Sequence, residues 1–280
     1  MKLVFFGTPD YVIPVLEKLS KYHEIVAVVT QNPKPAGRGK KIEYSAVDTW
    51  AHKKKVAKFF NFQNLPQADL GVCAAYGKII PNYIINGFKY GILNIHPSLL
   101  PKYRGASPIQ TAISDGDTET GVTIIKMDDK MDHGPIVSSF KEEIAQNDTL
   151  ETLRIKLFEK SSQFLIDLIP KFSKGKINLK HQDENLATYT KMVKKEDGYI
   201  DLKKTDPIEI ERKFRAYQPW PGIWTNLQVK SHKSEVTKKL KILKCHFELR
   251  TSDLVLDTVQ LEGKKPVSWE QFKQAYSLNF

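Results

Sequence analysis

Three polar residues in the middle of the chain, Asn94, His96 and Asp132, have the types and spacing to act on a carbonyl group. Asn94 can donate through its amide, His96 can carry a proton or donate to an oxyanion, and Asp132 can orient or charge the imidazole. When an amine attacks a carbonyl, negative charge develops on oxygen and positive charge on nitrogen, so donors and a proton acceptor are both needed. The three residues therefore suit acyl transfer to an amine.

Asn94 and His96 stand two residues apart at the end of an apolar run, 90–95, that predicts a β-strand. Side chains at positions i and i+2 of a strand leave the same face, so both can act on one atom. Pro97 and Pro101 cannot extend a sheet ladder and turn the chain out of the strand. We therefore expect the pair at the carboxyl end of a strand, where open α/β sheets bind ligands.

Spacing alone leaves a structural alternative open, because an Asn and a His at a strand end often only cap a turn, and the acidic residues around Asp132 could simply build a loop. No serine or cysteine lies in a G-x-S-x-G elbow. No general base stands at a spacing from Ser98 that would indicate activation of its hydroxyl as a nucleophile. A covalent acyl-enzyme is therefore not indicated, and direct transfer is the simpler mechanism.

The elements that must position these residues alternate between β-rich runs and helical patterns. Strands are predicted at 3–6, 25–30, 70–75, 90–95, 121–127 and 136–140, and helices at 10–21, 45–54 and 107–114. A long helix follows from about Asp148, and we expect Pro170 to end or kink it. This order predicts an α/β domain with a mostly parallel sheet. The first turn, Gly7 to Asp10, lacks the G-x-G-x-x-G spacing of a dinucleotide site.

The last third of the chain has a different pattern. Residues 173–198 are polar and aperiodic, which indicates a linker. A helix is then predicted at 207–217, followed by a Pro-Trp-Pro-Gly turn and β-type runs at 224–229, 240–249, 254–259 and 267–276. Several short strands after one helix favour a small β-barrel.

Composition narrows the class of protein. The 280 residues carry a net charge of +11, and residues 31–58 hold eight Lys or Arg against two acids, which favours a polyanionic partner. No apolar run is long enough for a membrane span, and the N-terminus lacks signal-peptide features, so we expect a cytoplasmic protein. Cys73 and Cys245 support neither a disulfide framework nor a metal site, and no metal is expected.

The string NIHPSLLPKYRGASPIQTAISDG, followed by TGVTIIKMDDKMDHGPI, resembles the 10-formyltetrahydrofolate-dependent formyltransferases. The family pattern carries its Asn, His and Asp at the positions of Asn94, His96 and Asp132, which the resemblance makes catalytic. It also implies a folate site lined by Ser98, Leu99, Leu100 and Pro101, and by Tyr76, Gly77, Lys78, Ile79 and Ile80. Without the resemblance, ordinary core would be the better interpretation of 76–80.

Segments outside this string resemble the family members that formylate methionyl-initiator tRNA for translation initiation. They are TQNPKPAGRGKKIEYSAV at 30–47, ADLGVCAAYGKIIP at 68–81, ATYTKMVKKEDGYIDL at 187–202 and RAYQPWPGIWT at 215–225. The resemblance implies that Arg38, Lys40 and Lys41 meet the tRNA. It also implies a Rossmann-like formyltransferase domain at 1–178, a linker at 179–198 and a shortened OB-like tRNA-binding barrel at 199–280.

Rival functions remain open at this stage. An N-formyltransferase acting on an amino-sugar nucleotide would share the N-terminal chemistry. The basic loop at 31–44, which carries Arg38, Lys40 and Lys41, and the Pro-Trp-Pro-Gly region favour tRNA instead. A non-catalytic RNA-binding protein would need only the basic barrel. A third possibility is hydrolysis of the formyl-folate, which differs from formyl transfer to an amine only in that water is the acceptor. We expect a monomer that uses 10-formyltetrahydrofolate as formyl donor and methionyl-initiator tRNA as acceptor.

Overall fold

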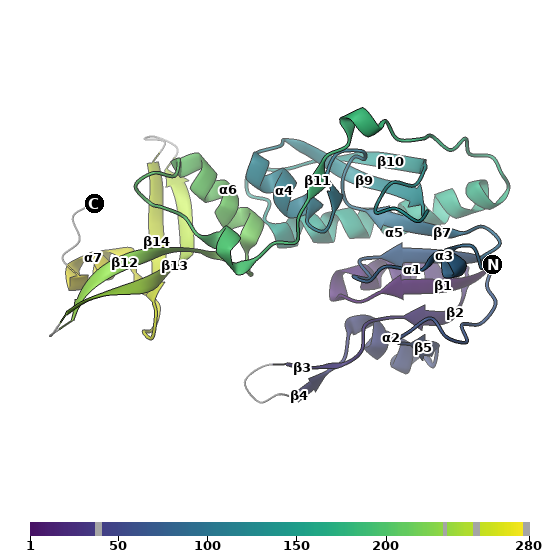
Figure 1. Ribbon diagram of the computed structural model, residues 1–280, viewed down its shortest axis with the longest axis horizontal. Helices are drawn as coiled ribbons and strands as arrows, with labels where there is room; N and C mark the ends of the chain where they lie inside the picture. The colour runs from purple at the N-terminus through teal and green to yellow at the C-terminus, as the bar shows by residue number, and fades with distance from the viewer. Residues whose placement is uncertain (37–40, 232–233, 249–252, 277–280) are drawn as a thin grey trace. The chain divides into compact units, whose positions relative to one another are not determined.

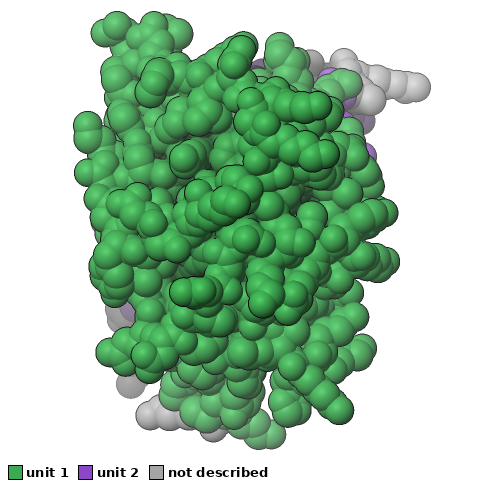
Figure 2. Space-filling view, turned by 90° about the vertical axis from the view of Figure 1, so that its right-hand side faces the viewer, with its two compact units in different colours: residues 1–108, 119–143, 152–190 green, residues 109–118, 144–151, 191–280 purple. Residues whose placement is uncertain are grey.

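The computed structural model of the chain describes residues 1–36, 41–231, 234–248 and 253–276 (Figure 1). The chain folds into two compact units. The first unit comprises residues 1–108, 119–143 and 152–190 (green in Figure 2). The second comprises residues 109–118, 144–151 and 191–280. Short stretches from the middle of the sequence therefore belong to the second unit.

The first unit is built on a seven-stranded sheet with the order β10-β9-β7-β6-β1-β2-β5 (Figure 1). These strands are β1 (Lys2–Gly7), β2 (Glu24–Val29), β5 (Ala57–Phe59), β6 (Leu70–Ala74), β7 (Ile92–His96), β9 (Glu119–Lys126) and β10 (Ile136–Glu143). The five strands from β7 to β5 are mutually parallel, and β9 runs antiparallel to both β7 and β10. The prediction of a mostly parallel α/β sheet is confirmed.

The central strands of this sheet are unbroken apolar runs in the sequence because both of their faces lie in the core. Leu3, Val4, Phe5 and Phe6 of β1 are fully buried, and all five residues of β6 are buried. A central parallel strand is covered on both faces, so both of its side-chain rows are apolar. The accompanying helices are α1 (Ile13–Tyr22), α2 (Ala46–Lys54), α3 (Asn82–Ile85) and α5 (Leu150–Ser173).

Two helix predictions differ in outcome. The helix predicted from residue 45 is α2, and Ser45 caps it by accepting a hydrogen bond of 3.0 Å from the Asp48 amide. The expectation that Pro170 ends the long helix is wrong, because α5 continues through it to Ser173, and the alternative expectation of a kink at Pro170 stays a prediction. Pro170 lies in the last turn, where the hydrogen bond it removes is one of many along 24 residues.

The second unit contains a four-stranded antiparallel sheet of β12 (Ile223–Ser231), β13 (Ser234–Glu248), β14 (Asp253–Leu261) and β15 (Val267–Ser268), in that order. Helices α4 (Pro108–Asp115), α6 (Pro207–Tyr217) and α7 (Trp269–Tyr276) belong to it. The strand predicted over 267–276 is wrong beyond Ser268. Trp269, Phe272 and Tyr276 recur at helical spacing, and buried Phe272 joins the core of this unit.

The division between the units falls at Thr190, inside the stretch 179–198 that the sequence indicates as a linker. Residues up to Thr190 are tied into the first unit, because β11 (Tyr189–Thr190) pairs in parallel with β8 (Arg104–Gly105). Within the described ranges, no helix is long and apolar enough to cross a membrane.

Candidate active site

Asn94, His96 and Asp132 come together at the carboxyl end of β7. The Asn94 Nδ2 atom lies 3.3 Å from Asp132 Oδ1, and His96 Nδ1 lies 3.5 Å from Asp132 Oδ2. Asn94 and His96 share one face of β7 because they are two residues apart. The structure thus brings the amide, the imidazole and the carboxylate predicted from the sequence into one cluster.

The imidazole of His96 is buried and held from its far side. Its Nε2 lies 2.9 Å from the carbonyl oxygen of Tyr103. A carbonyl oxygen only accepts, so Nε2 carries a hydrogen, and Nδ1 is the nitrogen that faces Asp132. The ring therefore offers Nδ1 for chemistry.

The carboxylate of Asp132 is fixed by three neighbours. Besides Asn94 and His96, the backbone N–H of Gly105 donates to Asp132 Oδ2 over 2.8 Å. The backbone of Asp132 itself has φ of +50°, a conformation that few residues other than glycine adopt. Such a backbone persists only where its surroundings hold it, and it marks this loop as constrained.

The loop that follows β7 is fastened to β9 by Thr123. The Thr123 hydroxyl donates to the carbonyl of Ser98 over 2.7 Å and accepts from the Leu100 amide over 3.0 Å. Ser98 is buried and donates its own hydroxyl to the carbonyl of Lys102 over 2.6 Å. Because that hydroxyl is already engaged, Ser98 fits a structural role better than a nucleophilic one.

The residues predicted to line a folate site follow two adjacent parallel strands, β6 and β7. Ser98 and Leu100 are buried, and Leu99 and Pro101 are half-buried. In the other segment Tyr76 and Ile80 are buried, whereas Gly77, Lys78 and Ile79 are exposed, Ile79 by 86%. Both segments lie where an open α/β sheet binds its ligand.

Tyr76 links the carboxyl ends of three strands. Its carbonyl accepts from Thr8 Oγ1 over 3.0 Å and from Gln31 Nε2 over 3.1 Å, while its ring packs edge-on against Phe6 and Phe62. Burial raises the pKa of its hydroxyl to about 12, and that buried hydroxyl has no hydrogen-bond partner among the described residues. The same segment thus holds an unpartnered buried hydroxyl, on Tyr76, and an exposed apolar side chain, on Ile79. This combination fits a ligand that has both polar and apolar edges.

The basic loop is described only in part. Lys41 is the exposed first residue of β4 (Lys41–Glu43), which pairs with β3 (Lys34–Ala36). Arg38 and Lys40, also predicted to meet tRNA, lie outside the described residues.

Sequence reasoning missed Gln182 and the role of Arg104. Gln182 Nε2 donates to the carbonyls of Asp132 and Gly134, each over 2.8 Å. Arg104 is 1% exposed, and its guanidinium binds both Gln182 and Glu184. Arg104 precedes a glycine, a pair that is typical of a loop and gives no sign of burial, and the aperiodic stretch around Gln182 contains no signal for the site.

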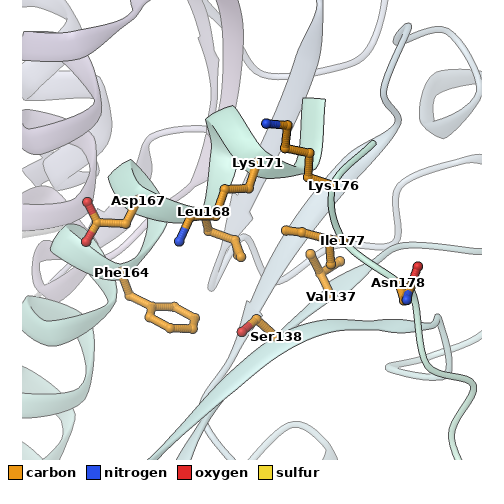
Figure 3. A pocket seen from close by; sticks show the side chains of 9 residues that line it. All are labelled: Val137, Ser138, Phe164, Asp167, Leu168, Lys171, Lys176, Ile177 and Asn178. Atoms are coloured by element: carbon orange, nitrogen blue, oxygen red, sulfur yellow. The ribbon is translucent and has the colours of Figure 1, made fainter. Parts of the chain in front are cut away.

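A separate pocket of about 360 Å³ lies in the first unit (Figure 3). Its walls come from β10, the last turns of α5 and the segment after that helix. It is lined by Val137, Ser138, Phe164, Asp167, Leu168, Lys171, Lys176, Ile177 and Asn178. None of the predicted site residues lines it. Among the described residues, no group of three or more His, Cys, Asp or Glu is arranged to hold a metal ion.

Comparison with known proteins matches both parts of the chain. The family model described as "Formyl transferase" matches residues 1–169, and that described as "Formyl transferase, C-terminal domain" matches residues 192–253. A methionyl-tRNA formyltransferase from Fusobacterium nucleatum is 36% identical over 294 residues, which cover 96% of this chain and 94% of the relative.

Two solved structures share the fold at 19% identity. The methionyl-tRNA formyltransferase from Clostridium thermocellum has a TM-score of 0.60 over 93% of this chain and 98% of its own. WlaRD, a sugar 3N-formyl transferase solved with dTDP and 5-N-formyl-THF, has a TM-score of 0.66 over 95% of this chain and 99% of its own. Since the family model covers more than half of the chain and the Fusobacterium relative nearly all of it, the chain belongs to the formyl transferase family, among the methionyl-tRNA formyltransferases.

Proposed function

We propose that this enzyme transfers the formyl group of 10-formyltetrahydrofolate to the α-amino group of methionyl-initiator tRNA, for translation initiation in the cytoplasm. The observation that carries the proposal is the cluster of Asn94, His96 and Asp132 at the carboxyl end of β7. It combines hydrogen-bond donors with a carboxylate, as attack of an amine on a formyl carbon requires. Family membership supports the choice of donor and acceptor.

Each residue of the cluster has a distinct task in this reaction. The second N–H of the Asn94 amide donates to the negative charge that develops on the formyl oxygen, and His96 does so from Nδ1–H when its imidazole carries a hydrogen on both nitrogens. Asp132 orients His96 and accepts the proton released by the attacking nitrogen. A carbon–nitrogen bond forms to the amine and the bond from the formyl carbon to the folate nitrogen breaks. The proton lost by the amine is returned to that folate nitrogen.

The folate would be held by the segments that follow β6 and β7. Ile79, Gly77 and Lys78 supply the exposed part of this surface, and Leu99 and Pro101 the half-buried part. Ser98, Leu100, Tyr76 and Ile80 support them from the core. 10-Formyltetrahydrofolate supplies an activated formyl group, and no metal is needed for the transfer.

The tRNA would be met by the basic loop that carries Arg38, Lys40 and Lys41. The C-terminal segment 199–280, with fifteen Lys or Arg against ten acids, would supply further positive charge. Lysine and arginine contacts to phosphates supply most of the affinity of such complexes. This loop also favours tRNA over the amino-sugar nucleotides used by relatives with the same fold, and we expect the enzyme to act as a monomer.

One assay tests the proposal. The purified protein is incubated with 10-formyltetrahydrofolate and methionyl-initiator tRNA, uncharged tRNA or an amino-sugar nucleotide, and formylated amine is measured. Formyl-methionyl-tRNA in the first arm alone is the expected result. Formylation of the sugar, or tRNA binding without transfer to any acceptor, would contradict the proposal.

A further inference from the structure

The backbone around Asp132 is held in an unusual path. Asp132 has φ of +50°, and at Gly134 an added Cβ would lie 1.9 Å from the carbonyl oxygen of Lys126. This loop therefore packs directly against the end of β9. Its conformation depends on contacts that compensate for the cost of a left-handed residue other than glycine.

One side chain supplies such contacts to both sides of the turn. The two hydrogens of the Gln182 amide go to the carbonyls of Asp132 and Gly134, each over 2.8 Å. These carbonyls flank His133, so a single amide group bridges the turn that presents the carboxylate of Asp132.

The orientation of the Gln182 amide is fixed by Arg104. Gln182 Oε1 accepts from Arg104 Nε over 3.0 Å and from Nη2 over 2.8 Å. A guanidinium only donates and a carbonyl only accepts, so the amide cannot be flipped without losing four hydrogen bonds. The remaining donors of Arg104 go to Glu184, over 2.7 and 2.9 Å, and to Tyr189 Oη over 3.2 Å.

The same arginine is joined to the carboxylate through the chain. Gly105, the residue after Arg104, donates its amide to Asp132 Oδ2 over 2.8 Å. Arg104 is buried, so its charge has little access to water and is compensated by the carboxylate of Glu184. The hydrogen bond from Arg104 lowers the pKa of that carboxyl. Contacts thus run from Asp132 through Gln182 to Arg104, and back through Gly105 to Asp132.

We infer that Gln182 is a positioning residue for formyl transfer, which holds the carboxylate of Asp132 against Asn94 and His96 by donating to the two carbonyls of its turn. The inference rests on the proposed function for its kinetic test. Gln182 donates to backbone carbonyls and not to the reacting atoms. It acts through the backbone of Asp132, where a displacement of about 1 Å can cost 10²-fold in rate.

Gln182→Glu tests whether Gln182 acts by donating hydrogen bonds to the turn or only by filling space. The variant keeps an acceptor for Arg104 and the size of the side chain, but it cannot donate to the carbonyls of Asp132 and Gly134. We expect kcat to fall about 10–100-fold, with KM for the folate and for the tRNA changed less than twofold. Gln67→Glu makes the same charge change at an exposed position and should leave both parameters unchanged.

A second readout needs no catalysis. The amide proton of Gly105 donates to Asp132 Oδ2 and therefore reports where that carboxylate lies. Its NMR signal should move upfield in Gln182→Glu and stay in place in Gln67→Glu. If Gln182→Glu fails to fold, Gln182→Ala, which also removes the donor, carries the same expectations.

The outcomes separate the two proposals. Unchanged kcat, or a lower kcat with the Gly105 signal unmoved, would overturn the positioning role, because the effect must pass through Asp132. A wild-type protein that transfers no formyl group would refute the proposed function alone, and the Gly105 signal would still decide the role of Gln182.

Discussion

The Nε2 atom of His96 lies 2.9 Å from the carbonyl oxygen of Tyr103, and this contact determines which imidazole nitrogen is available for catalysis. Nε2 must donate to that oxygen, so Nδ1 is left to face Asp132 at 3.5 Å. The 3.5 Å separation is longer than an ordinary hydrogen bond. Nδ1 is therefore free to engage a substrate atom as well as the carboxylate.

Two substitutions of His96 distinguish its nitrogens. His96→Asn places an amide group near the position of Nδ1, whereas His96→Gln places one near Nε2 and can keep the bond to Tyr103. Both should lower kcat by about the 10²–10³-fold typical of a weakened oxyanion donor, and His96→Asn should retain more activity. Single-turnover rates with saturating substrates measure this. Higher activity in His96→Gln would assign the chemistry to Nε2.

The hydroxyl of Thr123 is predicted to stabilise the loop after β7. Thr123→Val removes it and leaves the buried carbonyl of Ser98 and amide of Leu100 without that partner. The free energy of unfolding should fall by about 1–3 kcal/mol, and KM for the folate should rise because Leu99 and Pro101 lie in the same loop. Urea unfolding and steady-state kinetics check both.

Thr123→Ser is the matched control, since it keeps the hydroxyl and removes only a methyl group. It should retain the wild-type KM for the folate and lose less stability than Thr123→Val. Equal losses in the two variants would mean that the methyl group, rather than the hydroxyl, holds the loop.

Two different arguments predict the trio. The alternation along β7 places Asn94 and His96 on one face, whereas the catalytic role of Asp132 follows from the resemblance to the formyltransferases, since spacing alone also fits a plain loop. The strands β1 and β6 can also be predicted from the sequence, since a parallel strand that is covered on both faces has an unbroken run of apolar residues.

The remaining features depend on contacts between residues far apart in the sequence. Arg104 is buried because Glu184 and Gln182, about 80 residues away, meet its guanidinium, and composition alone predicts an exposed arginine. Gln182 lies in a polar stretch with no periodicity, so a linker was the natural expectation. Its function becomes visible only when its two carbonyl partners are known.

The thiol of Cys73 is expected to make the stability of the protein pH-dependent in alkali. Burial raises its pKa from 9.0 to about 12. Above pH 9 the unfolded chain loses this proton while the folded protein keeps it, so stability falls as pH rises from about 9 towards 12. This loss is about 1 kcal/mol per thiol between pH 8 and pH 10.

Urea unfolding at pH 8 and pH 10 measures that loss. Cys73→Ala should reduce the difference between the two pH values, although Cys245, whose pKa burial also raises to about 12, and Tyr76 retain their share. An identical difference in wild type and variant would show that Cys73 does not contribute.

The basic loop is predicted to set the salt dependence of tRNA use. Replacing Arg38, Lys40 and Lys41 together with alanine removes up to three phosphate contacts, each of which adds about 1 to the slope of log K against log salt. KM for the tRNA should rise and this slope should flatten by about 3, while folate binding is unchanged. Fluorescence titration with labelled tRNA between 50 and 200 mM salt measures the slope at concentrations where it is steep.

The matched control removes the same amount of charge elsewhere in the first unit. It replaces three exposed lysines, Lys171, Lys174 and Lys176, with alanine. Because counterion release depends on contact rather than on net charge, the control triple variant should keep the wild-type slope. Equal flattening in both triple variants would mean that total charge attracts the tRNA and that the loop makes no specific phosphate contacts.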